Sequence, residues 1–141
     1  MNPTDAINYI KTKFNLSDDD TNPKVLKGVN RQELYKLFAE LEYKVGCEVG
    51  LEKGKNAAIM FDNIPDLKLY GVDPYRQHKF ASYVYVAEIR HWNQRHLNNC
   101  MLQAVDRMKD KNFELIKDFS EEAVKDIEDL SLYFVYIDAD H

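Results

Sequence analysis

The amino-acid sequence predicts a single α/β domain built around a parallel β-sheet. Its 141 residues are the length of one domain, and a composition of 45% hydrophobic and 30% charged residues suffices for a globular core. From residue 45 onward, short apolar runs alternate with segments of helical periodicity. Strands that alternate with helices form parallel sheets with right-handed crossovers, and such sheets bind ligands beyond the carboxyl ends of their strands.

The first 30 residues are expected to form a helix and a loop that lead into this domain. Apolar residues recur at helical spacing over residues 3–14, with Asn2 as the cap and Pro3 in the first turn. Residues 15–30 are polar, contain a proline and a glycine, and show no sustained period, which indicates a loop. The three aspartates at 18–20 lack the spacing of a calcium loop, so we interpret them as a solvated turn.

The first half of the domain, from residue 31, predicts a β-α-β unit behind an opening helix. That helix, over about 31–43, starts on a capping box at Asn30 and carries an apolar stripe. A strand over 45–50, a helix over 55–61 and a second strand over 67–73 follow.

The second half continues the alternation after one ambiguous segment. Residues 76–92 combine strand-like alternation with helical flanks and could form a lid over a ligand. A helix over about 93–109 and a third strand over 113–116 come next. A short helix then opens with Ser120 as its cap, and the fourth strand covers 132–137.

A glycine-bracketed turn and a following acid indicate a nucleoside site. Gly50 and Gly54 flank the turn after the first strand, where the missing Cβ lets backbone N–H groups approach a ligand. Asp73 ends the next strand, where a carboxylate can accept both hydroxyls of a ribose. The glycine spacing does not fit the dinucleotide fingerprint, so one adenosine-bearing cofactor is favoured. The alternative is an ordinary strand-to-helix turn held by a capping aspartate.

Three motifs in order make the sequence resemble the class I S-adenosylmethionine-dependent methyltransferases, in their small-molecule O-methyltransferase-like branch. These motifs are EVGLEKG at 48–54, LYGVDPY at 69–75 and LYFVYIDADH at 132–141. The resemblance covers roughly residues 31–141. It implies a Rossmann-like three-layer sandwich and S-adenosylmethionine as the cofactor.

The resemblance also implies roles for single residues. Glu48 matches the acid that contacts the methionine amino group, directly or through water, and Asp73 matches the acid that holds the ribose hydroxyls. Gly50 and Gly54 would let the turn pass close under the cofactor. Glu52 departs from the pattern, because it occupies the place of a middle glycine.

Phe119 and Ser120 stand where the family places its adenine contacts. Many members have an acid in place of Phe119, so either Asp118 substitutes for that acid or Phe119 packs on the adenine ring.

Asp138 and His141 are the candidate catalytic residues. Asp138 matches an acid that binds a divalent cation such as Mg²⁺ in metal-dependent O-methyltransferases, where the cation activates the acceptor hydroxyl. His141 could act there as a base. The alternative is that Asp138 only caps the following turn and that His141 is merely a polar residue.

The remaining histidines and the cysteines are interpreted as structural. The spacing of the remaining histidines puts no two of them on one helical face; they are His78, His91 and His96. The two cysteines, Cys47 and Cys100, have no partner at a metal-ligand or redox spacing. The cysteines are therefore taken as small buried hydrophobes of a protein in a reducing compartment.

Charge and hydropathy argue against several partners. The formal charge of −5 offers no basic field for nucleic acid or anionic lipid. No apolar run is long enough to span a membrane and no leader precedes the domain, so a cytoplasmic location is expected.

A complete domain of this family would continue with a helix, a fifth strand and an antiparallel hairpin. We therefore expect a sheet of order 3-2-1-4 that is truncated after the fourth strand, and little turnover by this chain alone. The uncharged edge over 132–137 predicts a homo-oligomer that pairs through this strand.

The leading hypothesis for function is a methyltransferase that acts on a small hydroxylated molecule such as a sugar. A catalytically silent nucleotide-binding or interaction module that self-associates is the second hypothesis. A nicotinamide-dependent oxidoreductase is the third, disfavoured by the glycine spacing.

Overall fold

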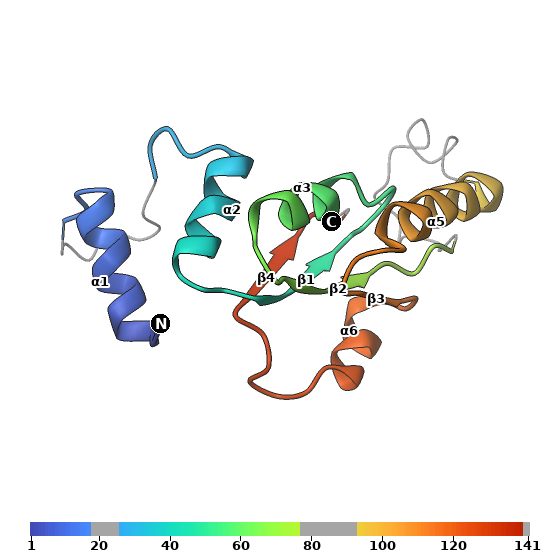
Figure 1. The fold of residues 1–141 in the computed structure, drawn as a ribbon. Coiled ribbons are helices and arrows are strands. Elements are labelled where there is room, and N and C mark those ends of the chain that lie inside the picture. Colours follow the sequence, from blue (N-terminus) through green and yellow to red (C-terminus); the bar gives the residue numbers. More distant parts are fainter. Residues whose placement is uncertain (18–25, 77–92, 140–141) are drawn as a thin grey trace, which may run out of the picture.

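The computed structural model describes residues 1–17, 26–76 and 93–139, and in them it shows the predicted α/β architecture. Four parallel strands form one sheet of order β3-β2-β1-β4, as the sequence predicts. Helices α2, α3 and α5 cover one face, and α6 lies on the other (Figure 1). The strands are β1 (Val45–Val49), β2 (Lys68–Val72), β3 (Phe113–Ile116) and β4 (Phe134–Ile137). The helices are α1 (Pro3–Lys13), α2 (Arg31–Glu40), α3 (Lys55–Asn63), α5 (Gln94–Met108) and α6 (Ser120–Ala123), the last continued by a 3₁₀ turn, η1 (Val124–Asp126).

The register brings the carboxyl ends of three strands together. Val49 of β1 lies opposite Val72 of β2 and Ile137 of β4. The strands stay joined just beyond this row, because the Gly50 amide donates to the Val72 carbonyl at 2.9 Å and the Asp138 amide donates to the Val49 carbonyl at 2.8 Å. Ligands of parallel sheets bind at this end, so the row positions the candidate site.

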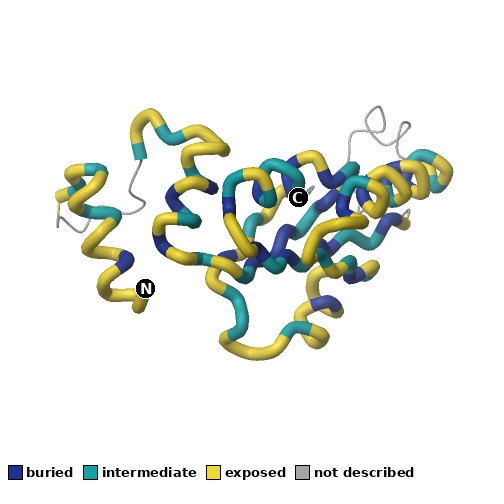
Figure 2. Tube along the Cα trace, viewed as in Figure 1, coloured by how far each residue is buried: buried dark blue, intermediate teal, exposed yellow. Residues whose placement is uncertain are grey.

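Apolar side chains are buried on both faces of the sheet. Figure 2 colours the buried residues dark blue along the strands and the helices that cover them. Met60 of α3 and Ala104 of α5 pack with Leu69 on one face. Cys47 and Val72 pack with Ala123 of α6 on the other. A sheet covered on both faces explains why its strands read as short apolar runs rather than as alternating patterns.

The helix ends differ from the sequence predictions where backbone conformation overrides the apolar pattern. The opening helix was expected to reach residue 43 but ends at Glu40, because Glu42 adopts a left-handed φ of 59°. The prediction that Ser120 caps its helix is wrong. The N-cap is Phe119, which has an extended backbone and no side-chain acceptor, and Ser120 is the first helical residue. The ambiguous segment over 76–92 lies almost wholly outside the described residues.

The N-terminal helix forms as predicted and packs on α2. The Asn2 side chain accepts a hydrogen bond from the Asp5 amide at 2.9 Å, and a proline opens the helix. Ala6 is buried with Leu37 and Leu41, which come from α2 and its C-terminal cap. In the described part of the chain, no helix is both long and apolar enough to cross a membrane.

Two glycines in the central strands make room for aromatic rings from the edge strands. A Cβ at Gly71 would lie 2.6 Å from the ring of Phe113, and one at Gly46 would overlap the ring of Phe134. Phe134 is itself held by stacking on Phe38 of α2, at 4.6 Å between ring centroids. These glycines therefore set how closely neighbouring side chains pack.

We expect Gly46→Ala to lower the free energy of unfolding by about 1–3 kcal/mol, because the added methyl group overpacks the Phe134 ring. Urea unfolding followed by circular dichroism measures this loss. In a Phe134→Leu background the same substitution should cost less, since the smaller side chain leaves space. An equal loss in both backgrounds would contradict the packing explanation.

Candidate functional site

Glu48 is a buried carboxyl group at the end of the central strand. Glu48 is 1% exposed to solvent, and its Oε1 accepts a hydrogen bond from the Asn56 side chain of α3 at 2.8 Å. The Asn56 carbonyl oxygen in turn accepts from the Tyr35 hydroxyl of α2 at 2.6 Å. The Glu48 Oε2 has no hydrogen-bond partner among the described residues. A buried acceptor without a partner is unfavourable, so this oxygen is suited to a donor from a ligand.

Burial raises the pKa of Glu48 to about 7, with the Asn56 hydrogen bond acting in the opposite direction. The negative charge of Asp138 raises this pKa further, whereas the Arg31 guanidinium lowers it. Near neutral pH, Glu48 is thus divided between its charged and neutral forms. A cationic group placed at Oε2 would favour the charged form.

The turn between β1 and α3 alternates left-handed residues. Gly50, Glu52 and Gly54 have φ values of 89°, 49° and 69°. Glu52 occupies the position where the resemblance expects a glycine, and it keeps the glycine-like conformation. A non-glycine residue in this region costs about 1–2 kcal/mol, so the surrounding contacts must hold it there.

The two bracketing glycines are explained by contacts within the protein. A Cβ at Gly50 would lie 2.5 Å from the Asp138 carbonyl oxygen and 2.7 Å from the Ala139 backbone. A Cβ at Gly54 would lie 3.3 Å from Ala104 on α5. The turn therefore needs glycine for its own packing, and close passage under a cofactor stays a prediction.

Asp73 holds this turn in place. Its Oδ2 accepts hydrogen bonds from the amides of Leu51 at 3.1 Å and Glu52 at 3.0 Å, and its Oδ1 accepts from the Tyr75 amide at 2.9 Å. Burial raises the pKa of Asp73, and the three backbone hydrogen bonds oppose that shift. A carboxylate offers about four acceptor positions, so these amides leave room for about one further donor. The structure thus contains the turn-holding contacts of the alternative interpretation, and the ribose contact stays a prediction.

The side chains of the two predicted adenine contacts, Phe119 and Ser120, lie in different surroundings. The Arg76 guanidinium lies 4.4 Å from the centroid of the Phe119 ring and donates a hydrogen bond to Asp118 Oδ1 at 3.3 Å. The same oxygen accepts from the Phe119 amide at 2.9 Å. Ser120 instead lines a pocket on the α6 face of the sheet. Phe119 and Asp118 therefore lie with Arg76 just beyond the ends of β2 and β3, whereas Ser120 belongs to the pocket on the α6 face.

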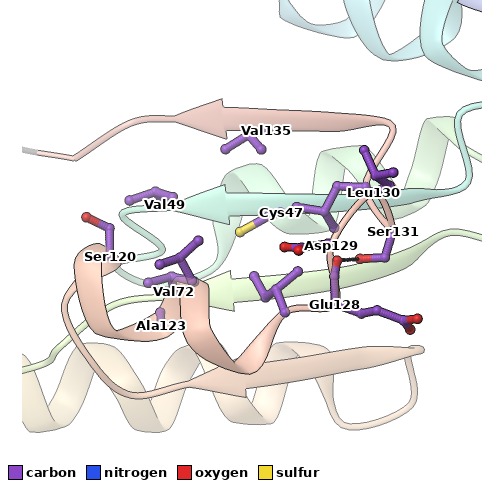
Figure 3. A pocket seen from close by; sticks show the side chains of 13 residues that line it. Cys47, Val49, Val72, Ser120, Ala123, Glu128, Asp129, Leu130, Ser131 and Val135 are labelled. Carbon is purple, nitrogen blue, oxygen red and sulfur yellow. Dashed lines mark hydrogen bonds between the residues drawn. The ribbon is translucent and has the colours of Figure 1, made fainter.

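That pocket has a volume of about 330 Å³ and is mostly apolar. Figure 3 shows strand residues Cys47, Val49, Val72 and Val135 facing residues of α6 and the segment that leads to β4. Cys47 and Val49 alternate with Glu48 along β1, so the pocket and Glu48 belong to opposite faces of the sheet. Burial raises the pKa of the Cys47 thiol to about 11, which keeps it neutral.

Asp138 follows β4 beside Glu48, with its side chain half exposed and 4.0 Å from Arg31. In the described residues, the one group of three possible metal ligands does not include it. The Mg²⁺ prediction thus gains no support, and His141 lies outside the described residues.

The sequence interpretation did not group three possible metal ligands that the structure brings together. Glu52, His96 and Cys100 place one ligand atom each within 4.8 Å of the others. His96 and Cys100 are four residues apart on α5, a spacing that puts both on one helical face. This i,i+4 spacing of a histidine and a cysteine is the sequence signal for the group, whereas no two histidines share a helical face.

Comparison with known proteins supports the fold. No protein-family model and no curated protein matches the sequence. The structure is similar to that of the O-methyltransferase TomG from Streptomyces achromogenes, involved in tomaymycin synthesis, in complex with SAM. The TM-score is 0.51 at 14% sequence identity, over 96% of this chain and 52% of TomG. This chain therefore spans about half the length of TomG and is similar to it in fold.

Proposed function

We propose that this chain is the cofactor-binding part of an S-adenosylmethionine-dependent methyltransferase that modifies a small hydroxylated molecule such as a sugar. The observation that carries the proposal is the buried Glu48 oxygen without a partner, at the carboxyl end of β1. S-adenosylmethionine carries an ammonium group that can donate to such an oxygen. The same fold occurs in TomG, which is an O-methyltransferase in complex with SAM.

In this proposal, residues around Glu48 bind the different parts of the cofactor. When bound, the cofactor supplies a methyl group on a positively charged sulfur. Glu48 would hold the ammonium group, and the one acceptor position left on Asp73 would take a ribose hydroxyl. Phe119, with Arg76 beside it, is the candidate contact for the adenine.

Asp138 is the candidate base for the acceptor hydroxyl, because it is half exposed and stands next to Glu48 at the ends of the strands. The Arg31 guanidinium lies 4.0 Å from this carboxylate and places a positive charge beside it. His141 is a second candidate from the sequence. Positioning of the acceptor would supply most of the rate enhancement, as in other in-line transfers between bound groups.

Isothermal titration of the chain with S-adenosylmethionine, its demethylated product and a nicotinamide dinucleotide tests the proposal. We expect the first two to bind and the dinucleotide to bind more weakly. Tighter binding of the dinucleotide would overturn the assignment. Binding of none of the three would favour the silent interaction module instead.

We further propose that the chain self-associates through β4, which is the edge strand next to β1. Val135 and Ile137 are 53% and 62% exposed along this strand. An edge of unpaired backbone groups beside apolar side chains favours pairing with another strand.

Sedimentation should therefore show a dimer or larger species, and Val135→Lys should shift it toward monomer because Lys opposes edge pairing. Val105→Lys is the matched control, since Val105 is 47% exposed on α5, away from the edge. A monomer at all concentrations, or equal shifts in both variants, would contradict the proposal.

A further inference from the structure

We propose that Glu52, His96 and Cys100 form a binding site for a divalent transition-metal ion, with Zn²⁺ the best match. The carboxylate, imidazole and thiol ligand atoms all lie within 4.8 Å of one another. They come from two separate elements, the turn after β1 and the helix α5. The proposal concerns the protein without cofactor, so it stands independently of methyl transfer.

The spacing of the two α5 ligands fits a tetrahedral ion. The Cys100 Sγ and His96 Nε2 are 3.4 Å apart. Zn–S and Zn–N bonds of about 2.3 and 2.0 Å at a tetrahedral angle place the two ligand atoms about 3.5 Å apart. An ion can therefore replace the present sulfur-nitrogen contact with little movement of the helix.

Hydrogen bonds hold the backbone of two of the three ligands, His96 and Glu52, in place. His96 lies in the first turn of α5, where its amide donates to the Asn93 cap at 2.9 Å. The Glu52 amide donates to Asp73 at 3.0 Å, and the Glu52 carbonyl oxygen accepts from the Tyr75 hydroxyl at 2.6 Å. These contacts hold Glu52 in its left-handed conformation with its side chain close to α5.

The ligand types select the metal. A thiolate and an imidazole suit Zn²⁺ and its neighbours in the transition series, whereas Mg²⁺ and Ca²⁺ prefer oxygen ligands only. Three protein ligands leave the fourth tetrahedral position for water or another small ligand. The three residues run from buried Cys100 through half-buried His96 to exposed Glu52, so an ion can enter from the Glu52 side.

Binding would displace the thiol proton. A cysteine thiol has an ordinary pKa of about 8.5, so it carries its proton near neutral pH in the metal-free protein. Forming the metal–sulfur bond breaks the S–H bond and releases one proton to the solvent, with no change of oxidation state.

The test is titration of the untagged, chelator-treated full chain with Co²⁺, followed by displacement with Zn²⁺. We expect one Co²⁺ per chain, the charge-transfer absorption of a Co²⁺–thiolate bond, and release of about one proton per ion near neutral pH. Cys100→Ala should abolish the charge-transfer absorption. His96→Ala should weaken binding at least about 100-fold, the upper end of what indirect ligand partners contribute.

Cys47→Ala is the matched control, because Cys47 is the other buried cysteine and lies on the opposite face of the sheet. It should leave the absorption unchanged. Circular dichroism checks that each variant is folded. If Cys100→Ala unfolds, His96→Ala still tests the site, because His96 is only half-buried and its replacement leaves the core intact. Absence of thiolate absorption in the parent chain would overturn the proposal. Stoichiometric binding that survives both His96→Ala and Cys100→Ala would overturn it as well, since other residues would then hold the ion.

Discussion

Glu48→Gln is expected to stabilise the folded protein by about 3 kcal/mol at about pH 8 and to remove the pH dependence that Glu48 contributes between about pH 4.5 and 7. The pKa of Glu48 is raised from 4.5 to about 7 by burial, so the folded state binds a proton that the unfolded state has released. The contribution of Glu48 to stability is therefore most favourable below pH 4.5, falls as the pH rises from 4.5 to about 7, and levels off above that. One pKa unit corresponds to about 1.4 kcal/mol, which gives the expected size.

Urea unfolding at about pH 5 and about pH 8 measures this effect in the parent chain and the variant. The neutral amide keeps an oxygen acceptor for Asn56 and carries no charge into the core. Glu114→Gln is the matched control, because Glu114 is an exposed glutamate on β3 of the same sheet. The same pH slope in the parent chain and in Glu48→Gln would contradict the role of this carboxyl group.

The same substitution should weaken the binding of S-adenosylmethionine. A charge-assisted hydrogen bond contributes about 1.5–3 kcal/mol, which corresponds to roughly tenfold to 100-fold in affinity. Stability and affinity would then move in opposite directions, which a general packing defect cannot produce. A more stable variant with unchanged affinity would place the ammonium group elsewhere and leave Glu48 as a buried residue only.

Asp73→Ala is expected to lower the free energy of unfolding by about 3 kcal/mol or more, because it removes the acceptor of three backbone amides at once. Glu52 would then lose one of the contacts that hold its left-handed backbone. Affinity for S-adenosylmethionine should fall by about 1–3 kcal/mol as well, if the carboxylate also accepts a ribose hydroxyl. Urea unfolding and isothermal titration measure the two losses separately.

Asp73→Asn separates the two roles of this residue. Its amide oxygen can still accept from the turn, so the turn should be retained in part, whereas the second carboxylate oxygen and the charge are lost. A folded variant that binds S-adenosylmethionine weakly would support the ribose contact. A folded variant with unchanged affinity would restrict Asp73 to holding the turn.

Local signals in the sequence were sufficient for the elements and their order. Caps at Asn2 and Asn30 and the β-α alternation after residue 44 predict the structure closely, because capping and hydrophobic periodicity act within one or two turns of the chain. Errors occur at ends such as Glu40 and Ser120, where a single backbone conformation decides the boundary.

The sequence by itself determined the parallel sheet and the acids at the ends of its strands, and its resemblance to the methyltransferases implied the strand order. Only the tertiary structure decided what those acids do: which Glu48 oxygen lacks a partner, and how many amides already occupy Asp73. It also brought Glu52, in the turn before α3, next to His96 and Cys100 on α5. The physical reason is that burial and hydrogen-bond partners come from residues distant in sequence, whose approach depends on how the whole sheet and its helices pack.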